Sequence, residues 1–287
     1  MLPLSQNYAK INKIIFFGVI KVKKILFIGT GNMACAIVNG IIKSKIVIAE
    51  NIFLFDKNEA QYSRFDPQCQ HVNSLAQAFS AVDYVFLSVK PQNIKEILAG
   101  ISSFEYKKPV FVSICAGITI ESIENALPGA KIVRTMPNTP LMLGQGVTAI
   151  CRNSLVDNND FDFVKSLFSS SGYVSEINEG DINALTAITS SSPAYIYLFA
   201  KSILEGAKEL NFNYDDTLKM ICYTLIGSAN MILTSDKSVD ELIKMVKSPN
   251  GTTEQALNVF ENSGFTDIVV DAMKACTKRA EELSKLN

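Results

Sequence analysis

Residues 24–40 read KILFIGTGNMACAIVNG and join a short apolar run to a glycine turn. Residues 25–28 are wholly apolar, as strands buried on both faces of a parallel sheet are. Gly29 suits a tight turn, Gly31 lets the backbone approach a pyrophosphate, and Ala34 takes the third, small position of the G-x-G-x-x-G/A pattern. With the helical pattern that follows, this order predicts a dinucleotide site; a plain tight turn is the alternative.

An acidic residue after the next predicted strand supports the dinucleotide site. Residues 52–55 are apolar, and Asp56 follows them, 22 positions after Ala34. A carboxylate about 20 residues beyond the glycines typically binds the adenosine ribose. It accepts from a free 2′-OH and repels a 2′-phosphate, which argues for NADH. Lys57 and Arg64 offset that repulsion, so we expect mixed use of NADH and NADPH.

The composition describes a soluble globular protein. The 287 residues are 48% hydrophobic with a net charge of −1, and the absence of a concentrated basic stripe argues against nucleic acid as a partner. Six scattered cysteines form no C-x-x-C pair, and His71 is the only histidine, which argues against a metal site. Reduced thiols favour a cytoplasmic protein.

The first 22 residues are a separate case. Residues 14–20 are apolar but too short to span a membrane, and lysines flank them. No small-residue cleavage site follows before the first strand. We interpret residues 1–22 as an N-terminal extension outside the core, with a weak signal or transit peptide as the alternative.

Strand and helix patterns alternate up to residue 178. Strands are expected at 71–73, 83–89, 109–114, 131–134, 146–150 and 173–177, and helices at 32–42, 74–81, 94–101, from 119, and at 159–170. This alternation predicts a mostly parallel sheet with helices on both faces, a Rossmann-type α/β domain over residues 23–178. The strand ends at Gly29, Asp56, Lys90, Cys115 and Met136 are expected to converge on one ligand crevice.

The pattern changes to helix alone in the C-terminal part. Helical spacing covers 181–210, with a break at 190–193, and then 214–233, 239–246, 252–262 and 266–286. We predict an all-helical domain over residues 179–287. Its long helices carry more apolar residues than a compact monomer needs, so we expect it to dimerise; a self-contained bundle is the alternative.

Two segments of small residues and prolines suggest ligand contact. Residues 134–140, RTMPNTP, predict a rigid loop that presents the amide of Asn138, with a surface turn as the alternative. Residues 189–195, TSSSPAY, break the helical pattern where a ligand or another helix would approach closely.

A third segment, residues 247–254, predicts an anion site at a helix start. It reads KSPNGTTE, in which Ser248 is a good N-cap and Pro249 suits the first helical position. The free N–H groups of that first turn, at residues 250–252, are expected to receive a carboxylate. An ordinary helix cap is the alternative.

Six motifs occur in an order that resembles one enzyme family. They are GTGNMA at 29–34, SVKPQ at 88–92, CAGIT at 115–119, MPNTP at 136–140, SPAY at 192–195 and SPNGTT at 248–253. From residue 24 onward the chain resembles pyrroline-5-carboxylate reductase, the enzyme of the last step of proline synthesis. The final motif, with Gly264-Phe265 downstream, is typical of that family rather than of dinucleotide-binding enzymes in general.

The resemblance implies reduction of a cyclic imine that carries a carboxylate, with hydride from NADPH or NADH. The cofactor residues that it implies are Ile28, Gly29, Thr30, Gly31, Asn32, Met33, Asn73, Ser88, Val89, Lys90, Pro91, Cys115, Ala116 and Gly117, with Asn138 near the nicotinamide. The substrate residues are Glu179, Asn250, Gly251, Thr252 and Thr253. Thr253 would hydrogen-bond the imine nitrogen and is the expected catalytic residue. The family forms homodimers through interlocked helical domains, and some members form rings of dimers.

The chemistry agrees with the resemblance, and two other functions remain open. An iminium accepts hydride readily, so the enzyme mainly has to hold the two reactants in the geometry of hydride transfer. A hydroxyacid dehydrogenase of similar layout would need a lysine in residues 181–195, which contain none. A dinucleotide-binding protein without turnover stays possible because Ser190, Ser192, Asn250 and Met245 depart from the family's pattern close to the expected site.

Overall fold

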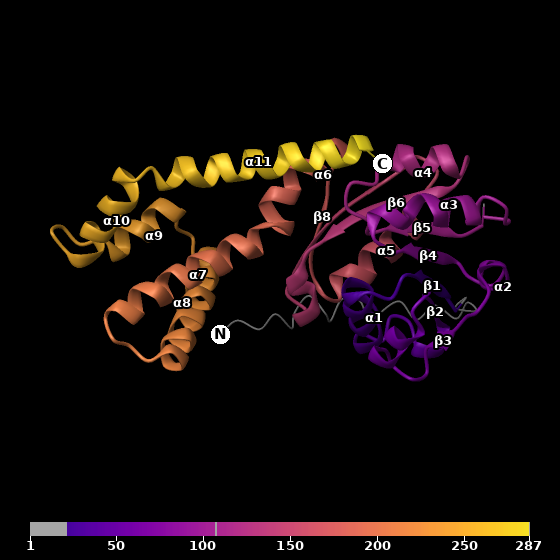
Figure 1. The fold of residues 1–287 in the computed structure, drawn as a ribbon, viewed down its shortest axis with the longest axis horizontal. Coiled ribbons are helices and arrows are strands. Elements are labelled where there is room, and N and C mark those ends of the chain that lie inside the picture. The colour runs from indigo at the N-terminus through magenta and orange to yellow at the C-terminus, as the bar shows by residue number, and fades with distance from the viewer. Residues whose placement is uncertain (1–21, 107, 287) are drawn as a thin grey trace.

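The computed structural model describes residues 22–106 and 108–286, so the expected extension at residues 1–22 lies outside the described residues except for Val22. An α/β part occupies one end of the molecule, and an arm of helices reaches away from it (Figure 1). The last helix, α11 (Phe265–Leu286), runs back along this arm to the α/β part (Figure 1). There the Leu283 side chain lies against Gly117, in the turn that follows a strand.

Eight strands form one sheet in the order β3-β2-β1-β4-β5-β6-β7-β8. They are β1 (Ile25–Ile28), β2 (Ile52–Phe55), β3 (Gln70–His71), β4 (Tyr84–Leu87), β5 (Val110–Ser113), β6 (Lys131–Pro137), β7 (Gly146–Arg152) and β8 (Gly172–Glu176). Strands β1 to β6 are parallel, β7 is antiparallel to β6, and β8 is parallel to β7. The order 3-2-1-4-5-6 is that of the Rossmann fold, which confirms the predicted fold class.

The apolar strands are explained by helices on both faces of the sheet. Ile25 and Phe27 of β1 face one core, with α1 (Asn32–Lys43) and α5 (Asn158–Ser169). Leu26 and Ile28 face the other core, with α2 (Leu75–Phe79), α3 (Ile94–Ile101) and α4 (Ile120–Ala126). Successive side chains of a strand point to opposite faces, which explains why β1 and β4, covered on both faces, are apolar throughout.

The arm is helical throughout, as predicted. It contains α6 (Ile182–Leu185), a π-helical turn (Thr186–Ser190), α7 (Ser192–Glu209), α8 (Tyr214–Thr234), α9 (Val239–Val246), α10 (Thr252–Asn262) and α11. The expected break at 190–193 is real, because the π-helical turn ends at Ser190 and α7 starts with Pro193 in its first turn. Helices α7 to α10 lie far from the sheet (Figure 1).

The arm exposes many large apolar side chains. They include Tyr197, Leu198, Tyr223, Ile226, Leu233, Val246, Val259 and Ile268. Burying apolar side chains against a partner is favourable, so many large ones exposed on one group of helices mark a surface suited to pairing. The arm therefore has the surface of an association domain.

The start of α10 corrects one expectation. The N-cap of this helix is Gly251, so neither Ser248 as N-cap nor Pro249 in the first helical turn was right. Asn250 has φ of +58°, a left-handed conformation that cannot belong to a right-handed helix. Residues 248–251 instead form a turn closed by the Gly251 N–H on the Ser248 carbonyl at 2.9 Å. Because the Asn250 N–H also donates to Glu254, two of the three N–H groups that were expected to be free are already bonded.

A bilayer crossing needs a long, apolar helix. Within residues 22–106 and 108–286, none of the helices meets both conditions.

The burial of apolar residues in the central strands indicates which of them stabilise the α/β part. Ile25 is fully buried and sits between Ile52 and Tyr84 in the sheet, whereas Ile48 is 56% exposed. Ile25→Ala should lower the free energy of unfolding by about 2–5 kcal/mol because it leaves a cavity, and Ile48→Ala by less than about 1 kcal/mol. Urea unfolding followed by circular dichroism measures both. Equal losses would contradict this description of the core.

Candidate functional site

A cavity of about 610 Å³ opens at the carboxyl ends of β1, β2 and β4. It is lined by Ile28, Gly29, Thr30, Gly31, Asn32, Phe55, Asp56, Lys57, Asn58, Gln61, Arg64, Ser88, Val89, Lys90, Asn93, Glu96 and Ile97. The chain leaves β1 toward β2 and later returns to β4 on the other side of β1, so this is the switch point of the sheet. Dinucleotides bind at such a point in doubly wound folds.

The glycine turn brings the backbones of β1 and β4 together. Gly29 has φ of +93°, and a Cβ on it would lie 2.6 Å from the Ser88 carbonyl oxygen. The Ser88 hydroxyl donates to the Gly29 carbonyl at 2.6 Å and to the Ile28 carbonyl at 2.9 Å. Gly31 is the N-cap of α1, and space is open where its Cβ would be. The first N–H groups of α1 therefore face a site that a phosphate fits.

Asp56 is fixed to the glycine turn. Its Oδ2 accepts from the Thr30 N–H at 2.7 Å and from the Thr30 hydroxyl at 2.8 Å, and its Oδ1 accepts from the Asn58 N–H at 2.9 Å. Burial alone would raise the pKa of this carboxyl, but the hydrogen bonds from Asn58 and Thr30 outweigh it and hold the pKa below its usual value. Asp56 is therefore a fixed negative charge at neutral pH.

Cationic side chains line the same cavity. The Lys57 ammonium lies 2.8 Å from a Glu96 carboxylate oxygen, and both side chains are exposed. The Arg64 guanidinium donates to Asn32 Oδ1 at 2.7 Å and to Gln61 Oε1 at 2.8 Å. Both cations therefore already have partners in the cavity, a carboxylate for Lys57 and two side-chain amides for Arg64.

The expected cofactor residues divide into two groups. Those that line the cavity are Ile28, Gly29, Thr30, Gly31, Asn32, Asp56, Ser88, Val89 and Lys90; those outside its lining are Met33, Asn73, Pro91, Cys115, Ala116, Gly117 and Asn138. Sequence reasoning missed Asn58 and Gln61, which follow Asp56 in the next turn, and Asn93 and Glu96 at the start of α3. These residues follow the ends of β2 and β4, where ligands bind in sheets of this kind, so their position along the chain could have identified them.

Cys115 is a buried core thiol rather than a reactive group. It donates to the carbonyls of Leu87 and Val89, both at 3.3 Å. Burial raises its pKa to about 11, so the thiol is neutral at physiological pH. The residue thereby ties the end of β5 to the end of β4.

Asn138 joins the sheet to the arm. Its Oδ1 accepts from the Val147 N–H at 2.8 Å, and its Nδ2 donates to the Thr189 carbonyl at 3.0 Å in the π-helical turn. The side chain is buried. Its amide therefore positions the arm's first turn; contact with a nicotinamide stays a prediction.

Glu179 is held where the arm begins. Its Oε1 accepts from the Arg134 guanidinium at 2.8 Å and from the Ile120 N–H at 2.7 Å, at the start of α4. The Arg134 side chain is only 3% exposed, so its charge needs this partner. Sequence reasoning gave Arg134 no role, although a charged residue directly after the apolar pair Ile132-Val133 in a predicted strand was the signal.

Residues 250–253 include the N-cap and the first two residues of α10, at the outer end of the arm (Figure 1). The Asn250 N–H donates to Glu254 Oε2 at 2.8 Å, and the Lys247 ammonium lies 3.7 Å from Glu254 Oε1. The strands whose carboxyl ends frame the cofactor cavity belong to the α/β part, away from this end of the arm (Figure 1). Within one chain, the expected substrate segment and the cavity are therefore apart.

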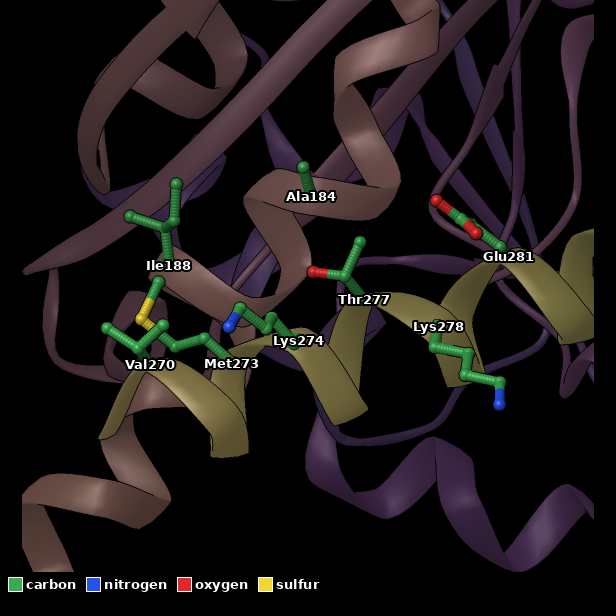
Figure 2. A pocket seen from close by; sticks show the side chains of 8 residues that line it. All are labelled: Ala184, Ile188, Val270, Met273, Lys274, Thr277, Lys278 and Glu281. Carbon is green, nitrogen blue, oxygen red and sulfur yellow. The ribbon is translucent and has the colours of Figure 1, made fainter. Parts of the chain in front are cut away.

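A second hollow of about 440 Å³ lies between the start of the arm and α11. Figure 2 shows Ile188 of the π-helical turn gathered with Val270 and Met273 of α11, while Lys278 points away. Close by, the Cys276 thiol lies 3.2 Å from the Ser191 hydroxyl. The Ser190 hydroxyl is buried and has no hydrogen-bond partner among the described residues. The hollow is mostly apolar and belongs to the same helices that expose apolar surface.

Comparison with known proteins covers almost the whole chain. The chain is 34% identical over 268 residues to the pyrroline-5-carboxylate reductase of Escherichia coli (strain K12), which covers 92% of this chain and 99% of the relative. It belongs to the pyrroline-5-carboxylate reductase family. The relative from Corynebacterium melassecola is also 34% identical, over 91% of this chain and 98% of its own. The resemblance read from the six motifs is thereby confirmed.

Family models and solved structures agree with this membership. Residues 179–283 match the model "Pyrroline-5-carboxylate reductase dimerisation", and residues 24–117 match "NADP oxidoreductase coenzyme F420-dependent". A Coxiella burnetii pyrroline-5-carboxylate reductase superposes with a TM-score of 0.83 at 33% identity, over 92% of this chain and 99% of that one. A Plasmodium falciparum pyrroline carboxylate reductase with NADP bound gives a TM-score of 0.84 at 28% identity, over 91% and 98%.

The two glycines of the turn should respond differently to alanine. Gly29→Ala places a Cβ against the Ser88 backbone at a positive φ, so the variant should lose folding stability. Gly31→Ala meets no atom within 4 Å, so it should fold normally but weaken dinucleotide binding, because the methyl group occupies the pyrophosphate site. Thermal unfolding and nucleotide titration separate the two effects. Normal binding by folded Gly31→Ala would argue against a pyrophosphate there.

Glu179 provides a test of the contact between the arm and the sheet. Glu179→Gln removes the charge that compensates buried Arg134 and should cost about 1–3 kcal/mol in unfolding free energy. Glu105→Gln, at an exposed position, should cost less than about 0.5 kcal/mol. Denaturant unfolding of both variants provides the comparison. If the two were equally stable, the Arg134 contact would not support the fold.

Proposed function

We propose that this protein reduces 1-pyrroline-5-carboxylate to L-proline by hydride transfer from NAD(P)H, the last step of proline biosynthesis. The observation that carries the proposal is the family match, which extends over the α/β part and the arm together. The cavity at the switch point supports it, because it offers a glycine turn, a helix start and an acid to one dinucleotide. No observation favours a hydroxyacid dehydrogenase or a protein without turnover.

The reaction depends mainly on how the protein positions its two reactants. Protonation of the imine nitrogen gives an iminium carbon that accepts hydride from the nicotinamide, so the protein must hold the two groups at reacting distance. We assign the substrate carboxylate to the N–H groups of Thr252 and Thr253 in the first turn of α10, because the N–H groups of Asn250 and Gly251 already donate to Glu254 and to the Ser248 carbonyl. In this assignment Thr252 and Asn250 flank the carboxylate, and the Thr253 hydroxyl hydrogen-bonds the nitrogen.

A complete site needs two copies of the chain. The expected substrate segment lies at the outer end of the arm, whereas the strands that frame the cofactor cavity belong to the α/β part of the same chain (Figure 1). The arm exposes the apolar surface that pairing would bury, and its residues match a dimerisation model. We therefore propose a homodimer in which each cofactor meets the start of α10 from the partner subunit; a larger ring of such dimers is compatible with it.

The domain division follows from the same features. We propose a dinucleotide-binding domain over residues 23–178 and a dimerisation and substrate domain over 179–287, after an extension at 1–22. The first domain holds the sheet and the cofactor cavity. The near-neutral charge and the free thiols support a cytoplasmic protein that binds small molecules rather than nucleic acid.

The proposed reaction is tested by mixing the purified protein with NADH or NADPH, with and without pyrroline-5-carboxylate. Consumption of the reduced nucleotide, followed by its absorbance, should depend on the imine, and proline should form in equal amount. A folded protein that binds nucleotide but consumes none with either cofactor would refute the proposal.

Thr253→Ala tests the assigned catalytic residue. Loss of a hydrogen bond to the reacting nitrogen should lower kcat/KM about tenfold or more while the affinity for nucleotide stays the same. Thr234→Ala makes the same deletion at the exposed end of α8 and should keep wild-type rates. Unchanged turnover in Thr253→Ala would remove Thr253 from the mechanism.

A further inference from the structure

The two candidate cofactors differ only at the adenosine ribose. NADPH carries a 2′-phosphate there, and NADH a free 2′-OH. The groups that discriminate between them must therefore surround the end of β2, where Asp56 lies. Residues Thr30, Asn58 and Arg64 line the same cavity as Asp56.

The Asp56 carboxylate is held in one orientation by its neighbours. Thr30 donates to it twice, from its N–H at 2.7 Å and from its hydroxyl at 2.8 Å, and Asn58 donates once at 2.9 Å. Thr30 itself is fully buried within the glycine turn. An ionised carboxylate offers roughly four acceptor positions; Thr30 and Asn58 take three, and a ribose hydroxyl would share the fourth with the weaker hydrogen bond from the Lys57 backbone.

The same restraint opposes a 2′-phosphate. To move its charge away from a phosphate, Asp56 would have to break its hydrogen bonds to Thr30, and the buried hydroxyl would lose its partner. Without that movement, two negative groups would meet at contact distance in a partly desolvated cavity.

The neighbouring cations do not remove this opposition. Lys57 is paired with Glu96 at 2.8 Å, so its ammonium would have to leave that carboxylate to reach a 2′-phosphate. Arg64 donates to Asn32 and Gln61, which turns its guanidinium toward the start of α1. A two-point grip on a 2′-phosphate would require Arg64 to release at least one of these amides.

We propose that the Thr30 hydroxyl, by fixing the Asp56 carboxylate in the cavity, makes this protein select NADH over NADPH. Asp56 is the specificity-determining residue, and Thr30 is its positioning residue. The proposal rests on the reductase function for the identity of the reaction, but nucleotide selection is measurable without turnover. It also replaces the mixed use expected from the sequence with a definite preference.

The experiment titrates NADH and NADPH into the purified protein without substrate, and then repeats the comparison as kcat/KM with pyrroline-5-carboxylate. The wild type should favour NADH by more than about tenfold, the scale of a lost hydrogen bond to a charged group. Thr30→Val keeps the shape of the side chain but deletes the hydroxyl, and should reduce this preference about three- to tenfold. Thr30→Ser restores the hydroxyl and should restore the preference.

Asp56→Ser keeps the test decisive if Thr30→Val fails to fold, and should shift the preference toward NADPH. The proposal is overturned by a wild type that favours NADPH, by an unchanged ratio in Thr30→Val or Asp56→Ser, or by Thr30→Ser losing as much selectivity as Thr30→Val. Failure of the reductase function has a different signature, since nucleotide titration would retain the preference while imine-dependent consumption would be absent.

Discussion

The contact between Gly29 and Ser88 is the constraint on which the cofactor site depends. The backbones of the β1 turn and the β4 end approach so closely that a Cβ on Gly29 would lie 2.6 Å from the Ser88 carbonyl oxygen. The Ser88 hydroxyl donates to two carbonyls across the same junction. The turn therefore delivers Gly31 and the start of α1 to the switch point, where a dinucleotide's diphosphate can reach backbone N–H groups.

A second constraint keeps the cofactor cavity and the expected substrate segment of one chain apart. Asn138 and the Arg134–Glu179 pair fix the base of the arm to the sheet. The start of α10 is thereby kept at the outer end of the arm, away from the sheet of its own chain (Figure 1). The apolar surface of the arm favours pairing of two chains. In the proposed homodimer, the interactions that drive dimerisation therefore also complete the active site.

The sequence predicted the features that depend on local pattern. Helices α9 and α10 begin and end where their apolar spacing placed them, and β1 follows from its apolar run. The N-cap of α10 was mispredicted because the left-handed conformation of Asn250 is not encoded by capping preference alone. The Thr30–Asp56 hydrogen bonds and the Arg134–Glu179 pair could not be predicted, since they join residues far apart in the sequence.

The most direct test of a shared active site is the activity of purified mixed dimers. One chain carries Gly31→Ala and its partner carries Thr253→Ala, so a shared arrangement leaves one intact site. This dimer should show about half of wild-type turnover, although each parent is impaired. A wild-type chain paired with a chain carrying both substitutions should have no intact site. The opposite pattern, with an impaired first dimer and a half-active second, would show that each chain builds its own site.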